Sequence, residues 1–301
     1  MTCYADTSSS GTYLDRLNTV RFHEAAMNWV LVQEEHHRGS VDPYVARTIM
    51  QAAYLASHFQ LGQEKDKGIS SVFDKYRRHL HQCHDISQRI IQEIEGHSQA
   101  LNTSLKNRQT SEVLRLPSVR NLTNDVETFL YHAKLAFREL KGLFLFTQDK
   151  KFRTTTQYNH IADWSEKRFG VNNHLSRWLR ANCDWIQKLM DSRNAVEHPD
   201  ASTLVIKNFH LDERGNISDP IWVLNDEAPM SLKKDMEVIP VNMLEYAEVL
   251  LVYALNNAKT ISPIVIAEIP EKKRNKDTPM RFIATLKQDL DENGMYKYDR
   301  N

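Results

Sequence analysis

Glycine and proline are scarce in this chain, and their scarcity constrains its fold more than any other feature. The 301 residues contain nine of each. Both residues interrupt regular helices, glycine because its backbone is so free and proline because it lacks an amide hydrogen. Long helices are therefore favoured over a loop-rich or all-β fold. The length suffices for one large domain or two smaller ones with an ample core.

Charge and cysteine content narrow the class of protein. The 39 basic side chains balance the 39 acidic ones, so no overall positive charge indicates a nucleic-acid partner. The cysteines, Cys3, Cys83 and Cys183, are odd in number and widely spaced, so no disulfide framework follows. The first residues lack the basic and apolar parts of a signal peptide, and the apolar runs are too short to span a bilayer. We therefore expect a cytoplasmic protein without a membrane partner.

Apolar periodicity predicts an N-terminal helical region over residues 13–110. The preceding residues, 1–12, are small and polar and are expected to form a disordered tail. Within the helical region, the spacing of apolar residues predicts helices over 13–37 and 70–101. Another helix is expected to begin at Asp42-Pro43, with Asp as the N-cap and Pro at the first helical position.

A helical bundle is predicted over residues 118–258, after a polar segment that ends at Pro117. Apolar spacing predicts its helices at 118–148, 160–168, 174–198 and 241–258. Two short apolar runs around Gly215 predict a β-hairpin inserted at 203–224. A similar pattern predicts a C-terminal hairpin at 262–287, followed by a tail at 288–301.

The predicted fold class is therefore mainly α: an antiparallel helical bundle with an N-terminal helical extension and small β-hairpins in the C-terminal third. An isolated hairpin is marginally stable in water. The two hairpins are therefore expected to pair into one small antiparallel sheet.

A polar motif closes the predicted helix over 174–198. The apolar stripe of this helix consists of Leu175, Trp178, Leu179, Ile186, Leu189 and Met190. Continuing the stripe by three and four residues reaches Arg193 and Asn194, so the inward face becomes polar in its last turn. A buried arginine requires a carboxylate, a group of carbonyls or a bound anion. This helix end is therefore the best candidate for a functional site.

His198 follows Asn194 by one turn, and Pro199 disfavours the α conformation for it, so the helix is expected to end there. Arg193 and His198 would lie about 140° apart on an ideal helix. They can act on one target only if the helix end unwinds or a second copy supplies one of them. A structural role stays open, because Arg193 can pair with Glu197 and a histidine interacts well with a helix C-terminus.

The sequence Arg193-Asn194-x-x-x-His198 at the end of an inward-facing helix resembles the HEPN superfamily (higher eukaryotes and prokaryotes nucleotide-binding). Other Arg/His pairs in the chain meet the loose spacing of the family signature. Requiring Asn after Arg and four intervening residues leaves this pair alone. The resemblance covers roughly residues 118–258 and implies a HEPN-like bundle there.

The resemblance implies a metal-independent endoribonuclease in which the 2′-hydroxyl of RNA attacks the neighbouring phosphate. His198 would transfer the proton, Arg193 would bind the phosphate and Asn194 would orient the site. It also implies a homodimer through the motif helices and a role as a toxin or defence effector, with an antitoxin or regulatory protein as a further partner. Because some family members are inactive, the alternative to an enzyme is a non-catalytic module that binds nucleotide, RNA or protein. A purely helical scaffold is a third interpretation.

A locally basic stretch supports an RNA partner. Residues 134–180 contain ten Lys or Arg and four Asp or Glu, with aromatic residues between them. Basic groups interleaved with aromatic rings suit a flexible single strand. Lys150, Lys151 and Arg153 are therefore candidate substrate-binding residues, although a solvated loop explains the same composition.

The motifs of other enzyme classes are weak or missing. His81 and Asp85 are four residues apart on a predicted helix, and such a pair can share a metal. The usual two-plus-two ligand spacing is missing, and a polar helix face explains this run as well. There is no Gly-rich phosphate loop, nucleophile elbow or zinc-protease motif. The sequence therefore predicts no metal and no cofactor.

Overall fold

The computed structural model describes residues 19–22, 29–32, 38–106, 115–258 and 263–289. The chain divides into two compact units, Met1–Gly39 and Ser40–Asn301. The tail expected at 1–12 lies outside the described residues, as does most of the tail expected at 288–301.

The first unit contains a β-hairpin where a helix was predicted. Strands β1 (Thr19–Phe22) and β2 (Trp29–Val32) are antiparallel, with Thr19 opposite Val32. The prediction of a helix over 13–37 is therefore wrong for these two segments. Both consist largely of β-branched and aromatic or other large apolar residues, which favour strands. Apolar spacing in such short runs does not distinguish the two kinds of element.

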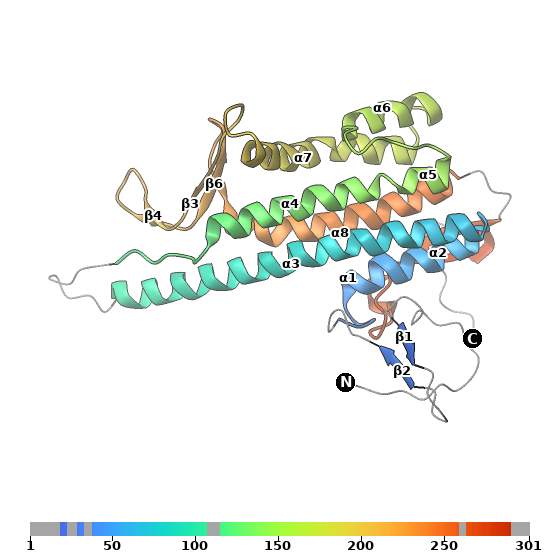
Figure 1. The fold of residues 1–301 in the computed structure, drawn as a ribbon, viewed down its shortest axis with the longest axis horizontal. Helices are drawn as coiled ribbons and strands as arrows, with labels where there is room; N and C mark the ends of the chain where they lie inside the picture. The colour runs from blue at the N-terminus through green and yellow to red at the C-terminus, as the bar shows by residue number, and fades with distance from the viewer. Residues whose placement is uncertain (1–18, 23–28, 33–37, 107–114, 259–262, 290–301) are drawn as a thin grey trace. The chain divides into compact units, whose positions relative to one another are not determined.

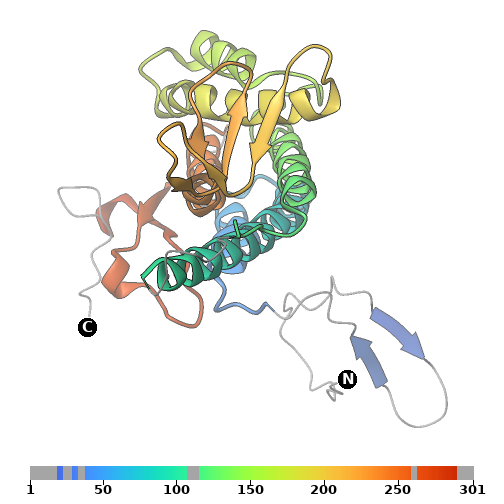
Figure 2. The same cartoon turned by 90° about the vertical axis from the view of Figure 1, so that its left-hand side faces the viewer.

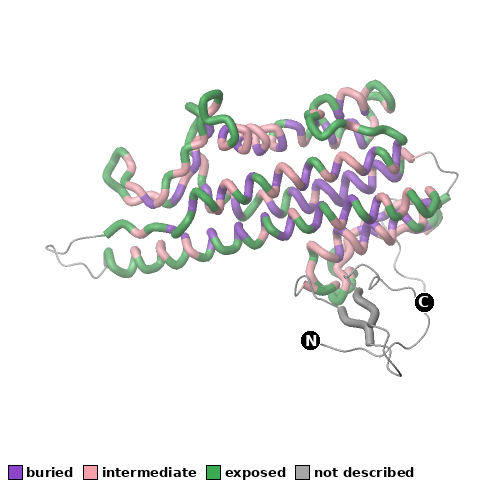
Figure 3. Tube along the Cα trace, viewed as in Figure 1, coloured by how far each residue is buried: buried purple, intermediate pink, exposed green. Residues whose placement is uncertain are grey.

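The second unit is mainly helical, as predicted, and four long helices form its centre. These are α3 (Gln63–Lys106), α4 (Leu122–Leu140), α7 (His174–Glu197) and α8 (Leu232–Asn256). They run alternately in opposite directions (Figure 1). They pack as a closed ring, in which α3 contacts α4, α4 contacts α7, α7 contacts α8 and α8 contacts α3. Buried residues gather where these helices face one another (Figure 3).

Shorter helices cover this ring. They are α1 (Pro43–Val45), the π-helical segment η2 (Ala46–Met50), α2 (Gln51–Phe59), α5 (Leu143–Gln148) and α6 (Tyr158–Phe169). The start at Asp42-Pro43 is confirmed, because the Asp42 carboxylate accepts a 2.7 Å hydrogen bond from the Tyr44 amide. α2 packs on α3, α5 packs on α3 and α8, and α6 packs on α7.

The N-terminal helical region predicted over 13–110 is not a separate unit. α3 shares one core with α4 and α8, so the bundle begins well before residue 118. α3 also begins at Gln63 rather than at residue 70. Residues 63–67 are all polar, and a turn without apolar residues gives no periodicity to detect.

Capping residues determine where α6 ends and where α7 begins. Gly170 ends α6 with a φ of 88°, and the Asn173 side chain caps α7 by accepting a 2.9 Å hydrogen bond from the Leu175 amide.

α8 begins at Leu232, well before the predicted residue 241. It continues through Pro240, which costs one helical hydrogen bond but does not end the helix.

The predicted hairpin at 203–224 is confirmed. β3 (Leu204–Lys207) and β6 (Ile221–Leu224) are antiparallel, with Leu204 opposite Leu224. Their connection contains a smaller antiparallel pair, β4 (His210–Leu211) with β5 (Ile217–Ser218), and β7 (Met230–Ser231) adds a third strand beside β6. This sheet lies at the end of the bundle where α7 ends and α8 begins (Figures 1 and 2).

The C-terminal hairpin is also confirmed, but its expected pairing with the first hairpin is wrong. β8 (Ile264–Glu268) and β9 (Phe282–Leu286) form a sheet of their own, with short 3-10 turns η3 (Glu271–Lys273) and η4 (Lys287–Asp289). The hairpin binds α2 instead. The Gln51 side-chain oxygen accepts hydrogen bonds from the amides of Arg281 (2.8 Å) and Phe282 (2.9 Å).

α8 is, among the described residues, the helix that is long and apolar enough to cross a membrane by length and composition. Of its most apolar 18-residue window, 67% is buried inside the structure, as in the core helix of a bundle. It also carries the buried Glu248 carboxylate, which forms an ion pair with Arg47. Burial raises the pKa of Glu248, although Arg47 and Arg281 act in the opposite direction.

Candidate functional site

The C-terminal end of α7 leaves helical geometry at His198, as Pro199 predicts. His198 has a φ of −134° and a ψ of 67°, outside the α region. Its amide still donates a 2.8 Å hydrogen bond to the Asn194 carbonyl, and its own carbonyl accepts one from the Ala201 amide at 3.0 Å. The His198 side chain is exposed. An imidazole is thus held at a fixed backbone position in contact with solvent.

Arg193 lies on the inward side of the same helix end, with 15% of its side chain exposed. One guanidinium nitrogen, Nη2, lies 3.4 Å from the Glu197 Oε1 atom. The guanidinium also lies over the Tyr131 ring of α4, 5.6 Å from the ring centre. Its Nε is buried without a hydrogen-bond partner in the described part of the chain. Arg193 therefore has the carboxylate partner that its position requires, but its donors are not all used.

Lys134 of α4 is a second cation that binds Glu197. Its ammonium donates hydrogen bonds to Glu197 Oε2 at 2.5 Å and to Asn194 Oδ1 at 3.3 Å. The Lys134 hydrogen bond is the main reason that the pKa of Glu197 is lowered, and the charges of Arg193 and His198 lower it further. Glu197 is therefore held ionised between Lys134 and Arg193.

We call Lys134, Arg193, Asn194, Glu197 and His198 the α7-end cluster. It contains two permanent cations and one carboxylate, so its net charge is positive even with a neutral imidazole. Of the predicted residues, Asn194 binds Lys134 and Arg193 pairs with Glu197, whereas His198 is linked to the cluster through the effect of its charge on Glu197. Lys134 was missed because it lies on another helix, 60 residues before Asn194. Periodicity within one helix cannot reveal such a contact.

The basic loop lies away from this cluster. Lys150, Lys151 and Arg153 are exposed, and the Lys150 ammonium lies 5.6 Å from the centre of the Phe152 ring. α5 continues in the direction of α4 (Figure 1). At 1.5 Å per residue, Lys150 therefore lies roughly 20 Å beyond Lys134 along the bundle. The structure does not bring these candidate substrate-binding residues to the α7-end cluster.

The metal-binding candidate His81 and the thiols of Cys83 and Cys183 lie in the buried interior of the bundle. His81 is buried on α3, with its Nδ1 atom 3.4 Å from Arg77 Nη1. Cys83 and Cys183 are buried free thiols. Among the described residues, no group of three His, Cys, Asp or Glu side chains could hold a metal ion.

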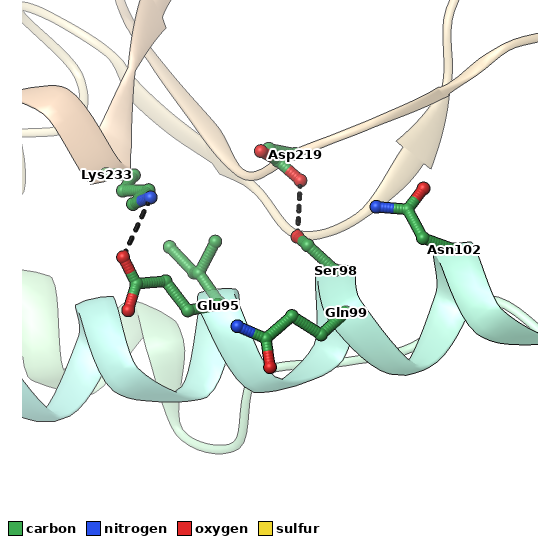
Figure 4. A pocket seen from close by; sticks show the side chains of 7 residues that line it. Glu95, Ser98, Gln99, Asn102, Asp219 and Lys233 are labelled. Atoms are coloured by element: carbon green, nitrogen blue, oxygen red, sulfur yellow. Dashed lines mark hydrogen bonds and ion pairs between the residues drawn. The ribbon is translucent and has the colours of Figure 1, made fainter.

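A polar hollow of about 290 Å³ lies between α3, the turn before β6 and the start of α8 (Figure 4). Lys233 Nζ is 3.0 Å from Glu95 Oε1 across this hollow, and Ser98 Oγ donates a 2.9 Å hydrogen bond to Asp219. The amides of Gln99 and Asn102 complete its polar lining. The hollow contains no proton-transfer group like His198, and its one cation is already paired.

Comparison with known proteins found no matching family model, no matching curated protein and no matching solved structure. The resemblance to the HEPN superfamily thus depends on the motif and on its place at the end of a bundle helix.

Proposed function

We propose that the protein is a metal-independent endoribonuclease of HEPN type, with the α7-end cluster as its site. The observation that carries this proposal is that Arg193, Asn194 and His198 share one helix end, where Lys134 adds a second cation beside Arg193 and Asn194. An exposed imidazole at the helix end that also holds two cations supplies a proton-transfer group near a place for a phosphate.

In the proposed reaction, His198 takes the proton from an RNA 2′-hydroxyl, and that oxygen forms a bond to the adjacent phosphorus. The bond from phosphorus to the 5′-oxygen breaks, and the leaving oxygen receives a proton from the protonated imidazole of a second copy of the chain. The products are a 2′,3′-cyclic phosphate and a 5′-hydroxyl. Arg193 stabilises the charge that develops on the phosphoryl oxygens. Imidazole suits both proton transfers because it titrates near neutral pH.

A specific observation favours a second candidate, a non-catalytic module that binds RNA, nucleotide or protein. Glu197 pairs with both Arg193 and Lys134, and this carboxylate partly neutralises the cations that a substrate would need. The same ion pairs are expected if the helix end has a purely structural role.

The test is incubation of the protein with labelled single-stranded RNA in the presence of EDTA. We expect products that end in a 2′,3′-cyclic phosphate, at a rate that EDTA does not change. His198→Ala and Arg193→Ala should each reduce the rate by about 100-fold or more. His160→Ala is the matched control, because His160 is an exposed histidine on α6 and should have no effect.

Binding of the same RNA is measured in parallel by fluorescence anisotropy. RNA that is bound but stays intact would support the binding module instead of the enzyme. RNA that is neither bound nor cleaved would contradict both the enzyme and an RNA-binding module.

A further inference from the structure

The Glu197 carboxylate joins two cations that come from different helices. We propose that Glu197 occupies the position of an RNA phosphate, and that Lys134 and Tyr131 of α4 complete a subsite for this phosphate and a neighbouring base. This inference rests on the function proposed above and adds to it both a set of binding residues and an internal competitor.

The geometry of the carboxylate is that of a bound anion. One oxygen, Oε1, lies 3.4 Å from Arg193 Nη2, and the other, Oε2, lies 2.5 Å from Lys134 Nζ. The two non-bridging oxygens of a phosphodiester can bind two cations in the same manner. Lys134 also binds Asn194 Oδ1, so the amide of the motif orients the ammonium.

The ion pairs are accessible to a competing anion. The side chains of Lys134 and Glu197 are 35% and 31% exposed. Ion pairs in contact with water contribute little net stability, and they weaken further as salt is added. Glu197 sits in the last turn of α7, next to the backbone change at His198, so a rotation of its side chain disturbs no buried packing.

Tyr131 provides a surface for a base beside this position. Tyr131 is 45% exposed, although Arg193 lies over its ring. The His132 ring lies edge-on to it, with ring centres 5.4 Å apart. An exposed aromatic ring next to cations is the usual arrangement for stacking a base of a single strand.

Removal of the Glu197 charge should therefore strengthen RNA binding. Glu197→Gln keeps the size of the side chain but leaves Arg193 and Lys134 without their carboxylate. Binding of single-stranded RNA is measured by fluorescence anisotropy over a series of salt concentrations. We expect Glu197→Gln to bind about tenfold more tightly than the unmodified protein, because two freed cations can then contact phosphate.

Two further variants test the α4 residues. Lys134→Ala should bind RNA about tenfold more weakly, and the slope of log affinity against log salt should become shallower by about 0.7. Tyr131→Leu should weaken binding of RNA several-fold and leave binding of an abasic oligonucleotide unchanged, because stacking requires a base.

The control for the carboxylate is Glu95→Gln on α3. Glu95 forms a 3.0 Å ion pair with Lys233 outside the basic stretch 134–180, so this variant also removes one charge from an ion-paired glutamate. Its RNA affinity should be unchanged. Thermal unfolding of each variant shows whether it is folded.

The outcomes separate this inference from the function on which it rests. If the unmodified protein cleaves RNA but Glu197→Gln binds RNA no more tightly, the inference is overturned and the proposed function stands. If neither protein binds RNA, both are overturned. If Lys134→Ala binds as tightly as the unmodified protein, α4 does not contribute the second cation.

Discussion

Two glycines on α3 show how single residues determine the packing of the bundle. A Cβ atom added at Gly68 would lie 2.2 Å from Cε1 of Phe146 on α5, whereas one added at Gly96 would have no atom within 4 Å. Gly68 therefore allows α5 to lie close to α3, and Gly96 has no such packing role.

The two alanine substitutions should consequently have opposite effects on stability. Gly96→Ala should raise the free energy of unfolding by up to about 1 kcal/mol, because alanine restricts the unfolded chain and favours helix. Gly68→Ala should lower it by about 1–3 kcal/mol, because Phe146 must be displaced. Urea unfolding measures both changes. Stabilisation by both substitutions would show that Phe146 moves aside without cost.

The partners of individual side chains could be predicted only where they are near in sequence. Periodicity placed Arg193 on an inward face, and the i,i+4 rule gave its partner Glu197. Lys134 and Tyr131 reach the same site from α4, and no spacing in the sequence connects them to it. Likewise, the sequence alone shows Gly68 only as a residue that weakens a helix. Its packing role follows from Phe146, which lies beside it in the structure.

At the scale of elements, a pair of histidines joins α3 to α4. The Nδ1 atoms of His79 and His132 are 3.1 Å apart, and both side chains are half-buried. Burial lowers the pKa of both imidazoles, and the nearby His132 lowers that of His79 further. As the pH falls below the ordinary histidine value, the unfolded chain therefore takes up protons before the folded one does. The stability that depends on the neutral pair is complete above that value and is lost as the pH falls.

We expect the free energy of unfolding to decrease between about pH 7.5 and about pH 5.5, in part because of this pair. A variant with both His79→Gln and His132→Gln should lose less stability over that range. His160→Gln removes an exposed histidine and should lose as much as the unmodified protein. Urea unfolding at the two pH values gives the comparison. An equal loss of stability in the double variant would show that the pair does not contribute to the pH dependence of unfolding.

Helix limits were predicted well where a cap determines them and poorly elsewhere. Asp42, Gly170 and Asn173 mark helix ends through hydrogen bonds or a left-handed φ at the same position in the chain. α8 was predicted too short because Pro240 usually ends a helix, whereas here the packing of the core outweighs one missing hydrogen bond. The separate sheets of the two hairpins depend on contacts with α2 and α8, which no local pattern contains.

At the scale of the whole molecule, the question is whether one copy or two form the site. The proposed reaction uses His198 of both copies, and a mixture of the unmodified protein with His198→Ala tests this. A heterodimer of the two has only one of the two imidazoles and should be inactive. Random pairing of equal amounts should then leave about one quarter of the cleavage rate of the same total amount of unmodified protein.

The two proteins are mixed under conditions that allow subunits to exchange, and RNA cleavage is measured together with molecular mass in solution. A site formed within one copy should leave about one half of the rate, because each unmodified chain then keeps a complete site. A monomer that cleaves RNA would equally contradict a shared site. Arg193 and His198 of one copy would then have to reach the same phosphate from the end of α7.

The position of α8 in the chain has a consequence for the folding of the protein during synthesis. α3, α4 and α7 all leave the ribosome before α8, yet α8 packs on α3 and α7 to close their ring. Contacts between segments so distant in sequence form slowly, and the exposed apolar faces of incomplete bundles promote aggregation. The core is therefore completed late, by the most apolar of the four long helices. A growing chain that stalls between α7 and α8 should therefore need a chaperone.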